Sequence, residues 1–239
     1  MQRIWYRLAY RNGPASELQT LPRPDRANAG GEVRPYFQDD AVTIYHGDCR
    51  EILPQLPYGL KQNDYRVASR GKLAKTTDYG DFDWDVLVDL ETIKQVIQSG
   101  VWAIMFGGNF YDLGRASCML VWDKDNGEND FADCELAWTN LFGSVRRLKW
   151  RWNGMLQEDM ANKEARVHPT QKPTNVMRWA IQQADIKAHH EMQTILDPFL
   201  GSGTTLRAAK DLGRKAIGIE IEERYCEIAA KRMSQGVLL

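Results

Sequence analysis

The stretch ILDPFLGSGTTLRAA, Ile195 to Ala209, decides the fold of this 239-residue chain. An apolar run ends in Asp197-Pro198-Phe199, a turn with two glycines follows, and a helical pattern begins at Thr204. Glycine permits a tight turn and a close approach of the backbone to a ligand. The N-terminus of a helix presents free N–H groups and a positive dipole end, which suit a carboxylate or a phosphate. We therefore predict a strand, a binding turn and a helix in this order.

A second apolar run, KAIGIEI at 215–221, contains an acid, Glu220, near its end. An acid at the tip of the second strand is the usual device for holding ribose hydroxyls. A plain glycine turn with a surface acid is the alternative interpretation. The strand, turn, helix, strand and acid in succession favour a cofactor that contains a nucleoside.

The rest of the chain alternates short apolar runs with helical patterns. The runs predict strands at 41–48, 101–108, 118–124, 144–152, 194–199 and 215–221, and the helical patterns lie at 85–100, 173–185, 204–213 and 222–233. This alternation is typical of an α/β fold with a mainly parallel sheet and helices on both faces. Ligands bind such sheets at the carboxyl ends of the strands.

Residues 12–36 are rich in Pro, Gly, Ala and Arg and lack periodicity, which predicts a flexible lead over residues 1–36. We expect regular structure to begin near Ala41 and a single domain to occupy 37–239.

Composition limits the classes of partner and of site. The formal net charge is −1, so nucleic acid would have to be met by a local basic patch. The four cysteines form no C-x-x-C pair, which argues against a structural zinc site or a disulfide scaffold and favours reduced thiols in the cytoplasm. No apolar run approaches the ~18 residues of a membrane span, and the N-terminal residues lack the features of a secretory signal. We expect neither a membrane nor a metal as partner.

Several motifs together resemble a known family. VHPTQKP (167–173) precedes DPFLGSGTT (197–205), and IYHGDCREIL (44–53) and GIEIEERYCEIAAKRM (218–233) accompany them. Over about residues 36–235 the chain resembles the amino-group (N6-adenine or N4-cytosine) DNA methyltransferases in the permuted β-type order. The segments 122–140 and 151–160 resemble their phage-type branch. The resemblance implies a Rossmann-like methyltransferase fold, S-adenosyl-L-methionine as cofactor, and double-stranded DNA as substrate, with the target base flipped out.

The resemblance also implies a cofactor site. Carried onto this sequence, it consists of Asp48, His168, Pro169, Thr170, Gln171, Lys172, Asp197, Pro198, Phe199, Gly201, Ser202, Gly203, Thr204 and Glu220. The segment 197–204 would cradle the methionine part and Glu220 would hold the ribose. Asp48 would accept from the adenine amino group, and 168–172 would close over the carboxylate side. Asp48 could instead be the N-cap of a helix beginning at Cys49, and His168 a packed loop histidine.

The catalytic stretch departs from the family. Members carry an Asp/Asn/Ser-Pro-Pro-aromatic tetrapeptide after a central strand. Here ILPQLPYGLKQ (52–62), aligned on Tyr58, reads Gln55-Leu56-Pro57-Tyr58. The acid is replaced by Gln55, and no apolar run lies between Leu53 and Pro57 to form the preceding strand. The sheet would then lack one central strand, and Gln55, Pro57 and Tyr58 are the catalytic candidates, Tyr58 for stacking on the flipped base.

Three accounts of this departure stay open. The chain could carry an internal deletion, or it could use a rerouted site in which Gln55 or Asp64 supplies the acceptor. It could also have lost catalysis while it keeps cofactor or DNA binding. A glutamine carbonyl accepts a hydrogen bond but offers no negative charge to a developing ammonium.

Two local basic runs could meet DNA, since basic side chains suit phosphates and aromatic ones suit exposed bases. The candidates are Lys61, Arg66, Arg70, Lys72 and Lys75 in the first run, and Arg147, Lys149 and Arg151 in the second. The first run could equally be a solvated loop, and the second an edge strand kept soluble by its charge. We interpret the acids of 126–138 as helix caps or solvated residues.

The sequence thus predicts an S-adenosylmethionine-dependent DNA methyltransferase that modifies an exocyclic amine, adenine N6 before cytosine N4. It would act in the cytoplasm of a bacterial or phage-infected cell, in restriction-modification. A decayed methyltransferase that only binds cofactor or DNA is the alternative from another class. A protein or RNA methyltransferase is a third possibility, which the paired C-terminal motifs disfavour.

Overall fold

The computed structural model describes residues 33–56, 64–68, 88–127, 132–153, 156–168 and 170–236, with only the backbone of 64–68 and 153. Nine strands form one sheet in the order β1-β2-β11-β10-β3-β4-β6-β5-β7. Their bounds are β1 Phe37–Gln38, β2 Val42–His46, β3 Asp64–Ala68, β4 Trp102–Phe106, β5 Met119–Asp123, β6 Cys134–Thr139, β7 Arg146–Lys149, β10 Thr194–Asp197 and β11 Lys215–Glu220. A two-stranded ribbon joins β8 Trp152–Asn153 to β9 Leu156–Gln157.

The centre of the sheet is parallel. Strands β2, β11, β10, β3 and β4 run in one direction, so their carboxyl ends share an edge. Beyond β4 the pairing becomes antiparallel through β6 and β5, and β7 returns parallel to β5. The predicted α/β architecture with a mainly parallel centre is confirmed.

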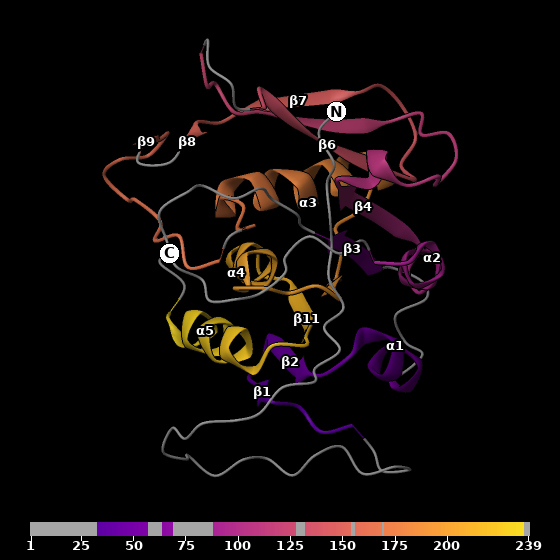
Figure 1. The fold of residues 1–239 in the computed structure, drawn as a ribbon, viewed down its shortest axis with the longest axis vertical. Helices are drawn as coiled ribbons and strands as arrows, with labels where there is room; N and C mark the ends of the chain where they lie inside the picture. Colours follow the sequence, from indigo (N-terminus) through magenta and orange to yellow (C-terminus); the bar gives the residue numbers. More distant parts are fainter. Residues whose placement is uncertain are drawn as a thin grey trace.

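Helices cover both faces of the sheet (Figure 1). The helices α3 Thr174–Ala188, α4 Thr204–Asp211 and α5 Glu223–Ser234 pack on one another over one face. The helices α1 Cys49–Ile52 and α2 Leu90–Gln98 lie over the other. Side chains of β10 alternate accordingly, since Ile195 joins the cluster under α3 and α4 whereas Leu196 joins that under α1.

The expectation that the sheet lacks a central strand is wrong. Strand β3, Asp64–Ala68, lies between β10 and β4 and pairs parallel with both. We interpreted this run as part of a basic loop that could contact DNA, because it follows the catalytic stretch and carries several basic residues with Tyr65 among them. A strand flanked on both sides gains its backbone hydrogen bonds from its neighbours, so its own weak pattern does not prevent it from forming.

Strand β6, Cys134–Thr139, was also missed, because we interpreted this acid-rich region as caps and solvated residues. The predicted strand at 144–152 is divided, with β7 in the sheet and Trp152 in the separate ribbon. Sheet contacts begin earlier than Ala41, since the N–H of Tyr36 donates to the carbonyl of Ile44 at 2.8 Å. Residues 1–32 lie outside the described part of the chain.

The predicted helices are all present, although their bounds shift. Helix α3 runs on to Ala188 and ends at His189, which has a left-handed φ of 59°. Helix α2 begins after the N-cap Asp89, whose carboxylate accepts from the N–H of Thr92 at 2.8 Å. Within the described ranges, none of the helices has the length and apolar character to cross a membrane.

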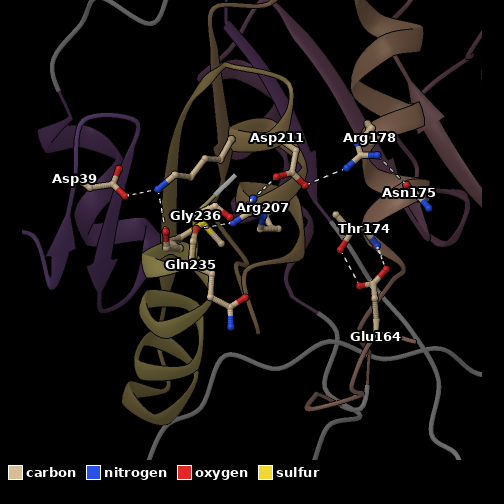
Figure 2. Close-up of polar contacts among 11 residues, drawn as sticks. Asp39, Glu164, Thr174, Asn175, Arg178, Arg207, Asp211, Gln235 and Gly236 are labelled. Carbon is tan, nitrogen blue, oxygen red and sulfur yellow. Dashed lines mark hydrogen bonds and ion pairs between the residues drawn. The ribbon is translucent and has the colours of Figure 1, made fainter. Parts of the chain in front are cut away.

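A polar network ties the helices of one face together (Figure 2). Asp211 of α4 pairs with both Arg207 of the same helix and Arg178 of α3. Arg207 also donates to the carbonyl of Gln235, just past α5, at 2.9 Å. Nearby, Glu164 accepts from the N–H and the hydroxyl of Thr174 at the start of α3. These bonds fix the three helices that support the glycine turn.

Candidate functional site

The candidate site lies at the carboxyl edge of the parallel strands. There the chain from β10 turns through α4 to β11 on one side, whereas β3 continues to β4 on the other. Such a switch point opens a crevice in which α/β proteins bind ligands. Asp48 after β2, Asp197 at the end of β10 and Glu220 at the end of β11 all lie at this edge.

The glycine turn is fixed to the tip of β11. The N–H of Gly201 donates to Glu220 Oε2 at 2.7 Å, and the N–H of Glu222 donates to Oε1 at 2.9 Å. Gly201 has a left-handed φ of 54°, which favours glycine. Burial raises the pKa of Glu220 to about 7, against the lowering effect of these two backbone bonds.

Asp197, at the end of β10, carries a fully buried carboxyl group. Its Oδ1 accepts from the N–H of Phe199 at 3.1 Å, whereas Oδ2 has no partner of ordinary geometry among the described residues. Burial raises the pKa of Asp197 to about 6, although Thr205, the Phe199 N–H and Lys172 each stabilise its anion. A buried acceptor of this kind suits a cationic group of a ligand.

The residues 165–168 and 170–172 lie against the glycine turn. Gln171 accepts from the N–H of Val167 at 3.0 Å, donates to the carbonyl of Ala165 at 2.9 Å, and accepts from the Ser202 hydroxyl at 3.3 Å. Its amide therefore fastens the segment to the glycine turn.

His168 lies in the same segment and is buried. Its Nδ1 accepts from the N–H of Thr170 at 3.1 Å, and its ring lies 4.3 Å from that of Tyr225, centroid to centroid. A Cβ at Gly201 would meet the imidazole at 3.4 Å. Burial lowers the pKa of His168 to about 3, so the ring is neutral at physiological pH and packs on the turn. The alternative of a packed histidine describes this geometry.

Lys172 is buried, and its Nζ lies 3.0 Å from Glu135 Oε2 and 5.3 Å from the centroid of the Phe106 ring. Glu135 also pairs with Lys124 at 2.7 Å. Burial opposes ionisation of Glu135, but the two lysines outweigh it and lower its pKa. Lys172, predicted to contact the cofactor, thus has a protein carboxylate as its ion-pair partner.

Asp48 takes the N-cap position that we gave as its alternative. Its Oδ1 accepts from the N–H of Arg50 at 2.8 Å, and its carboxylate pairs with the Arg50 guanidinium. Burial raises the pKa of Asp48, but the bonds from Arg50 outweigh this effect, so the pKa is lowered and the anion persists. An acceptor is thus held at the end of β2.

The catalytic candidates are only partly described. Gln55 is exposed, and its Nε2 donates to the carbonyl of Glu51 at 2.8 Å. Leu56, in place of the family's first proline, is buried with Leu196 and Ile219. Pro57 and Tyr58 lie outside the described residues, as does Pro169.

Asp64 cannot supply the acceptor at this edge. It is paired with Thr194 at the start of β10, three residues before Asp197. At about 3.3 Å per residue, its backbone lies about 10 Å from the carboxyl edge, toward the opposite end of the strands. The rerouted site through Asp64 is therefore wrong.

Only some of the predicted DNA-contacting residues lie in the described part of the chain. Lys61, Arg70, Lys72 and Lys75 lie outside the described residues, and the backbone of Arg66 belongs to the central strand β3 instead of a loop. In the second run, Arg147 pairs with Asp123 at 3.7 Å, and Lys149 and Arg151 pair with Asp125 at 2.7 and 2.5 Å. All three basic side chains are exposed on the edge of the sheet, where acids already neutralise them.

Two residues at the site were not predicted from the sequence. Glu135 contacts Lys172 from β6, and Arg232 of α5 donates to the hydroxyl of Thr204 at 2.8 Å. An acid beside the apolar run Leu136-Ala137-Trp138 was a signal that could have drawn attention to Glu135.

The described residues fit S-adenosylmethionine by their chemistry. Asp197 offers a buried acceptor for an ammonium group, and the N-terminus of α4 offers N–H groups for a carboxylate. Glu220 keeps lone pairs for hydroxyl donors, because each of its oxygens accepts one backbone bond.

Comparisons with known proteins agree with this arrangement. A family model described as DNA methylase matches residues 122–231. The type II methyltransferase M2.LlaDCHI of Lactococcus lactis subsp. cremoris is 37% identical over 260 aligned residues, which cover 85% of this chain and 93% of the relative. M2.DpnII of Streptococcus pneumoniae is 42% identical over 257, which cover 84% and 92%.

These alignments are longer than the chain itself. Since 85% of 239 residues is about 203, the 260 positions aligned with M2.LlaDCHI include about 57 that have no counterpart here. The relatives therefore carry internal residues that this chain lacks.

Solved structures share the fold. The PvuII DNA methyltransferase, named as cytosine-N4-specific, superposes with a TM-score of 0.56 at 15% identity, over 87% of this chain and 92% of its own. The M1.HpyAVI complex with its cofactor SAM gives 0.50 at 24% identity, over 80% and 99%.

Proposed function

The chain belongs to the amino-group DNA methyltransferases, which move the methyl group of S-adenosylmethionine to an exocyclic amine, and on that premise we propose adenine N6 as the acceptor. The remaining Pro57-Tyr58-Gly59 agrees with the DPPYG form of the family's tetrapeptide. The bacterial relatives, both named type II methyltransferases, support bacterial DNA as the substrate and a role in restriction-modification in the cytoplasm. The order of the motifs and the segments 122–140 and 151–160 support the β-type order and the phage-type branch.

The carboxyl edge carries this proposal, because one crevice gathers complementary groups for each part of the cofactor. When bound, S-adenosylmethionine supplies a methyl group activated by its sulfonium. The Asp197 carboxylate would take the ammonium group, and the N–H groups at the start of α4 the carboxylate. Glu220 would hold the ribose hydroxyls, and Asp48 the adenine amino group.

The remaining residues of 168–172 and 198–204 would enclose these groups. Gln171 fastens the closing segment to Ser202, and His168 packs on Gly201, so both restrict water at the turn. The protein therefore orients the reactants, whereas the cofactor provides the reactivity.

Catalysis also needs the amine to be presented to the methyl group. The amine lone pair is delocalised into the base, so acceptors for the amine hydrogens make it a better nucleophile. We assign stacking on the flipped base to Tyr58, backed by Pro57, and acceptance of an amine hydrogen to the Gln55 carbonyl oxygen, whose Nε2 side already bonds Glu51. The internal residues that the relatives carry and this chain lacks support the account of an internal deletion. No relative supports the account of lost catalysis.

Transfer of radiolabelled methyl from S-adenosylmethionine to unmethylated DNA, RNA and protein tests the proposal. We expect label in DNA alone, recovered as N6-methyladenine after nucleoside analysis, and its loss in Tyr58→Ala. Label recovered as N4-methylcytosine would show that the acceptor is cytosine N4 and not adenine N6. Absence of label with a folded, cofactor-binding chain would contradict the proposed activity.

A further inference from the structure

The ion cluster of Lys124, Glu135 and Lys172 lies at the candidate site, and the function proposed above gives no role to Lys124 or Glu135. Glu135 comes from β6, and Lys172 from the segment that closes over the glycine turn. Between β6 and β10 the sheet contains only β3 and β4. Phe106, the last residue of β4, is paired with Ala137, so Glu135 and the Lys172 ammonium lie at the carboxyl end of β4.

The Lys172 side chain is completely buried. Its side chain is 0% exposed, against 19% for Glu135 and 16% for Lys124. Its ammonium lies by the Phe106 ring and near enough to Asp197 to stabilise that carboxylate. A buried ammonium without a counter-charge is strongly unfavourable, and Glu135 supplies a carboxylate at ion-pair distance, so its removal should destabilise Lys172 in this position.

The position of Lys172 also fixes its neighbours in sequence. Gln171 bonds Ser202 of the glycine turn, and His168 packs on Gly201. Displacement of the Lys172 side chain would move the backbone that carries both contacts. Lys124 differs, because it is partly exposed over the Trp122 ring and lies outside this segment.

We propose that Glu135 is a positioning residue: it anchors Lys172 and thereby keeps 165–168 and 170–172 against the glycine turn in the geometry that admits S-adenosylmethionine. The inference rests on the proposed function and extends it to a residue on the far side of the site. It also links β6 to binding of the cofactor.

The effect of Lys172 on Asp197 predicts a change in the pH dependence of cofactor binding. The charged groups that act on Asp197 are Lys172 and Glu220, together with dipoles from Thr205 and the Phe199 N–H. If Lys172 moves away, Asp197 loses its cation and protonates at higher pH. Binding of S-adenosylmethionine should then weaken at a higher pH in the variant than in the wild type.

Titration calorimetry of the full chain with S-adenosylmethionine tests this. Glu135→Gln and Lys172→Met should each weaken binding about tenfold, a typical size for coupling between sites. The double variant should bind no more weakly than either single one, because both substitutions break the same link. Methyl transfer by Glu135→Gln at saturating cofactor should keep its kcat within about threefold, so that the loss lies in cofactor affinity.

Lys124→Met is the matched control, since it removes the other cation of Glu135 and leaves the pair with Lys172 intact. It should bind the cofactor within about twofold of the wild type. Equal losses in the Lys124→Met and Glu135→Gln variants, additive losses in the double variant, or wild-type affinity in folded Glu135→Gln would each overturn the inference. If Glu135→Gln does not fold, Lys172→Met decides, because it removes the buried charge itself.

Hydrogen exchange without cofactor tests whether Glu135 holds the segment, independently of whether the chain binds S-adenosylmethionine. Peptides from 165–172 should exchange faster in Glu135→Gln than in the wild type and Lys124→Met, and unchanged exchange would overturn the closure. A wild type that binds no S-adenosylmethionine would contradict the proposed function, while this comparison would still decide whether Glu135 holds the segment.

Discussion

At the scale of single residues, two acids of the candidate site are buried, and burial opposes their ionisation. Burial raises the pKa of Asp197 to about 6 and that of Glu220 to about 7. These two groups therefore bind more protons in the folded chain than in the unfolded chain between about pH 4 and pH 7, and their contribution to the free energy of unfolding falls as the pH rises across this range. Such perturbed groups in a crevice are typical of functional sites.

Asp197→Asn tests the role of this buried anion. The amide keeps the shape but cannot hold an ammonium by charge, so S-adenosylmethionine should bind about 10- to 100-fold more weakly at pH 8, the loss of a charged hydrogen bond of ~1.5–3 kcal/mol. In the wild type, affinity should fall as the pH drops through about 6, because Asp197 protonates. Calorimetry from pH 5 to pH 8 checks both, and a wild-type pH profile in Asp197→Asn would exclude Asp197 from cofactor binding.

At the scale of elements, the sequence predicted the strands and helices whose pattern is strong in isolation. The apolar run of β10, its glycine turn and α4 were predicted almost to the residue, because backbone requirements and apolar periodicity agree there. Strand β3 escaped prediction because its stability comes from pairing on both sides, which five residues do not reveal. Strand β6 was hidden by the acids before it and by Glu135 within it, which pairs with Lys124 and Lys172 from other segments.

The same limits apply to the site. Motif residues with backbone roles, such as Gly201, could be placed from sequence, whereas the partners of Lys172 and Asp48 could not. An ion pair between residues 135 and 172 depends on the order of strands in the sheet, and no local pattern encodes that order.

Val67→Pro tests whether β3 is a central strand. Proline removes a ladder donor and its ring cannot fit between two flanking strands, so the variant should fail to fold or lose at least ~3 kcal/mol. Val67→Ile keeps the N–H and should fold normally. Denaturant unfolding followed by circular dichroism compares the two variants. A stable Val67→Pro variant would show that this segment is not a central strand.

The contact between α4 and α5 makes a second prediction at this scale. Gly203 has a φ of 80°, and a Cβ there would lie 2.9 Å from that of Ala229. Gly203→Ala should cost about 2–4 kcal/mol through backbone strain and overpacking. Gly213→Ala has a similar φ of 71° but open space around it, so it should cost only about 1–2 kcal/mol. Equal losses in urea unfolding would show that α4 does not pack closely on α5.

At the scale of the whole molecule, charge is balanced and DNA must be met locally. The net charge is −1, and the exposed basic edge at Arg147, Lys149 and Arg151 is already paired with Asp123 and Asp125. Phosphates would have to compete with these carboxylates. The acids therefore weaken any binding of DNA at this edge and reduce its dependence on salt.

Asp125→Asn should release Lys149 and Arg151 for phosphates. Asp125 has a left-handed φ of 51°, which asparagine tolerates, so the backbone is preserved. If this edge meets DNA, affinity should rise about threefold and the slope of log affinity against log salt should steepen by about 1. Fluorescence anisotropy measures both. Glu227→Gln, an equal charge change on α5, is the control, and the same gain in both variants would remove the basic edge from the DNA interface.

The central claim is that one crevice at the carboxyl edge of the sheet binds S-adenosylmethionine, and hydrogen exchange of the wild-type chain with and without the cofactor tests it most directly. The account predicts slower exchange on binding in 46–50, 165–172, 197–205 and 218–222, and no change at the opposite edge, in 140–144 and 189–194. Protection at the opposite edge, or none at the glycine turn with bound cofactor, would contradict it.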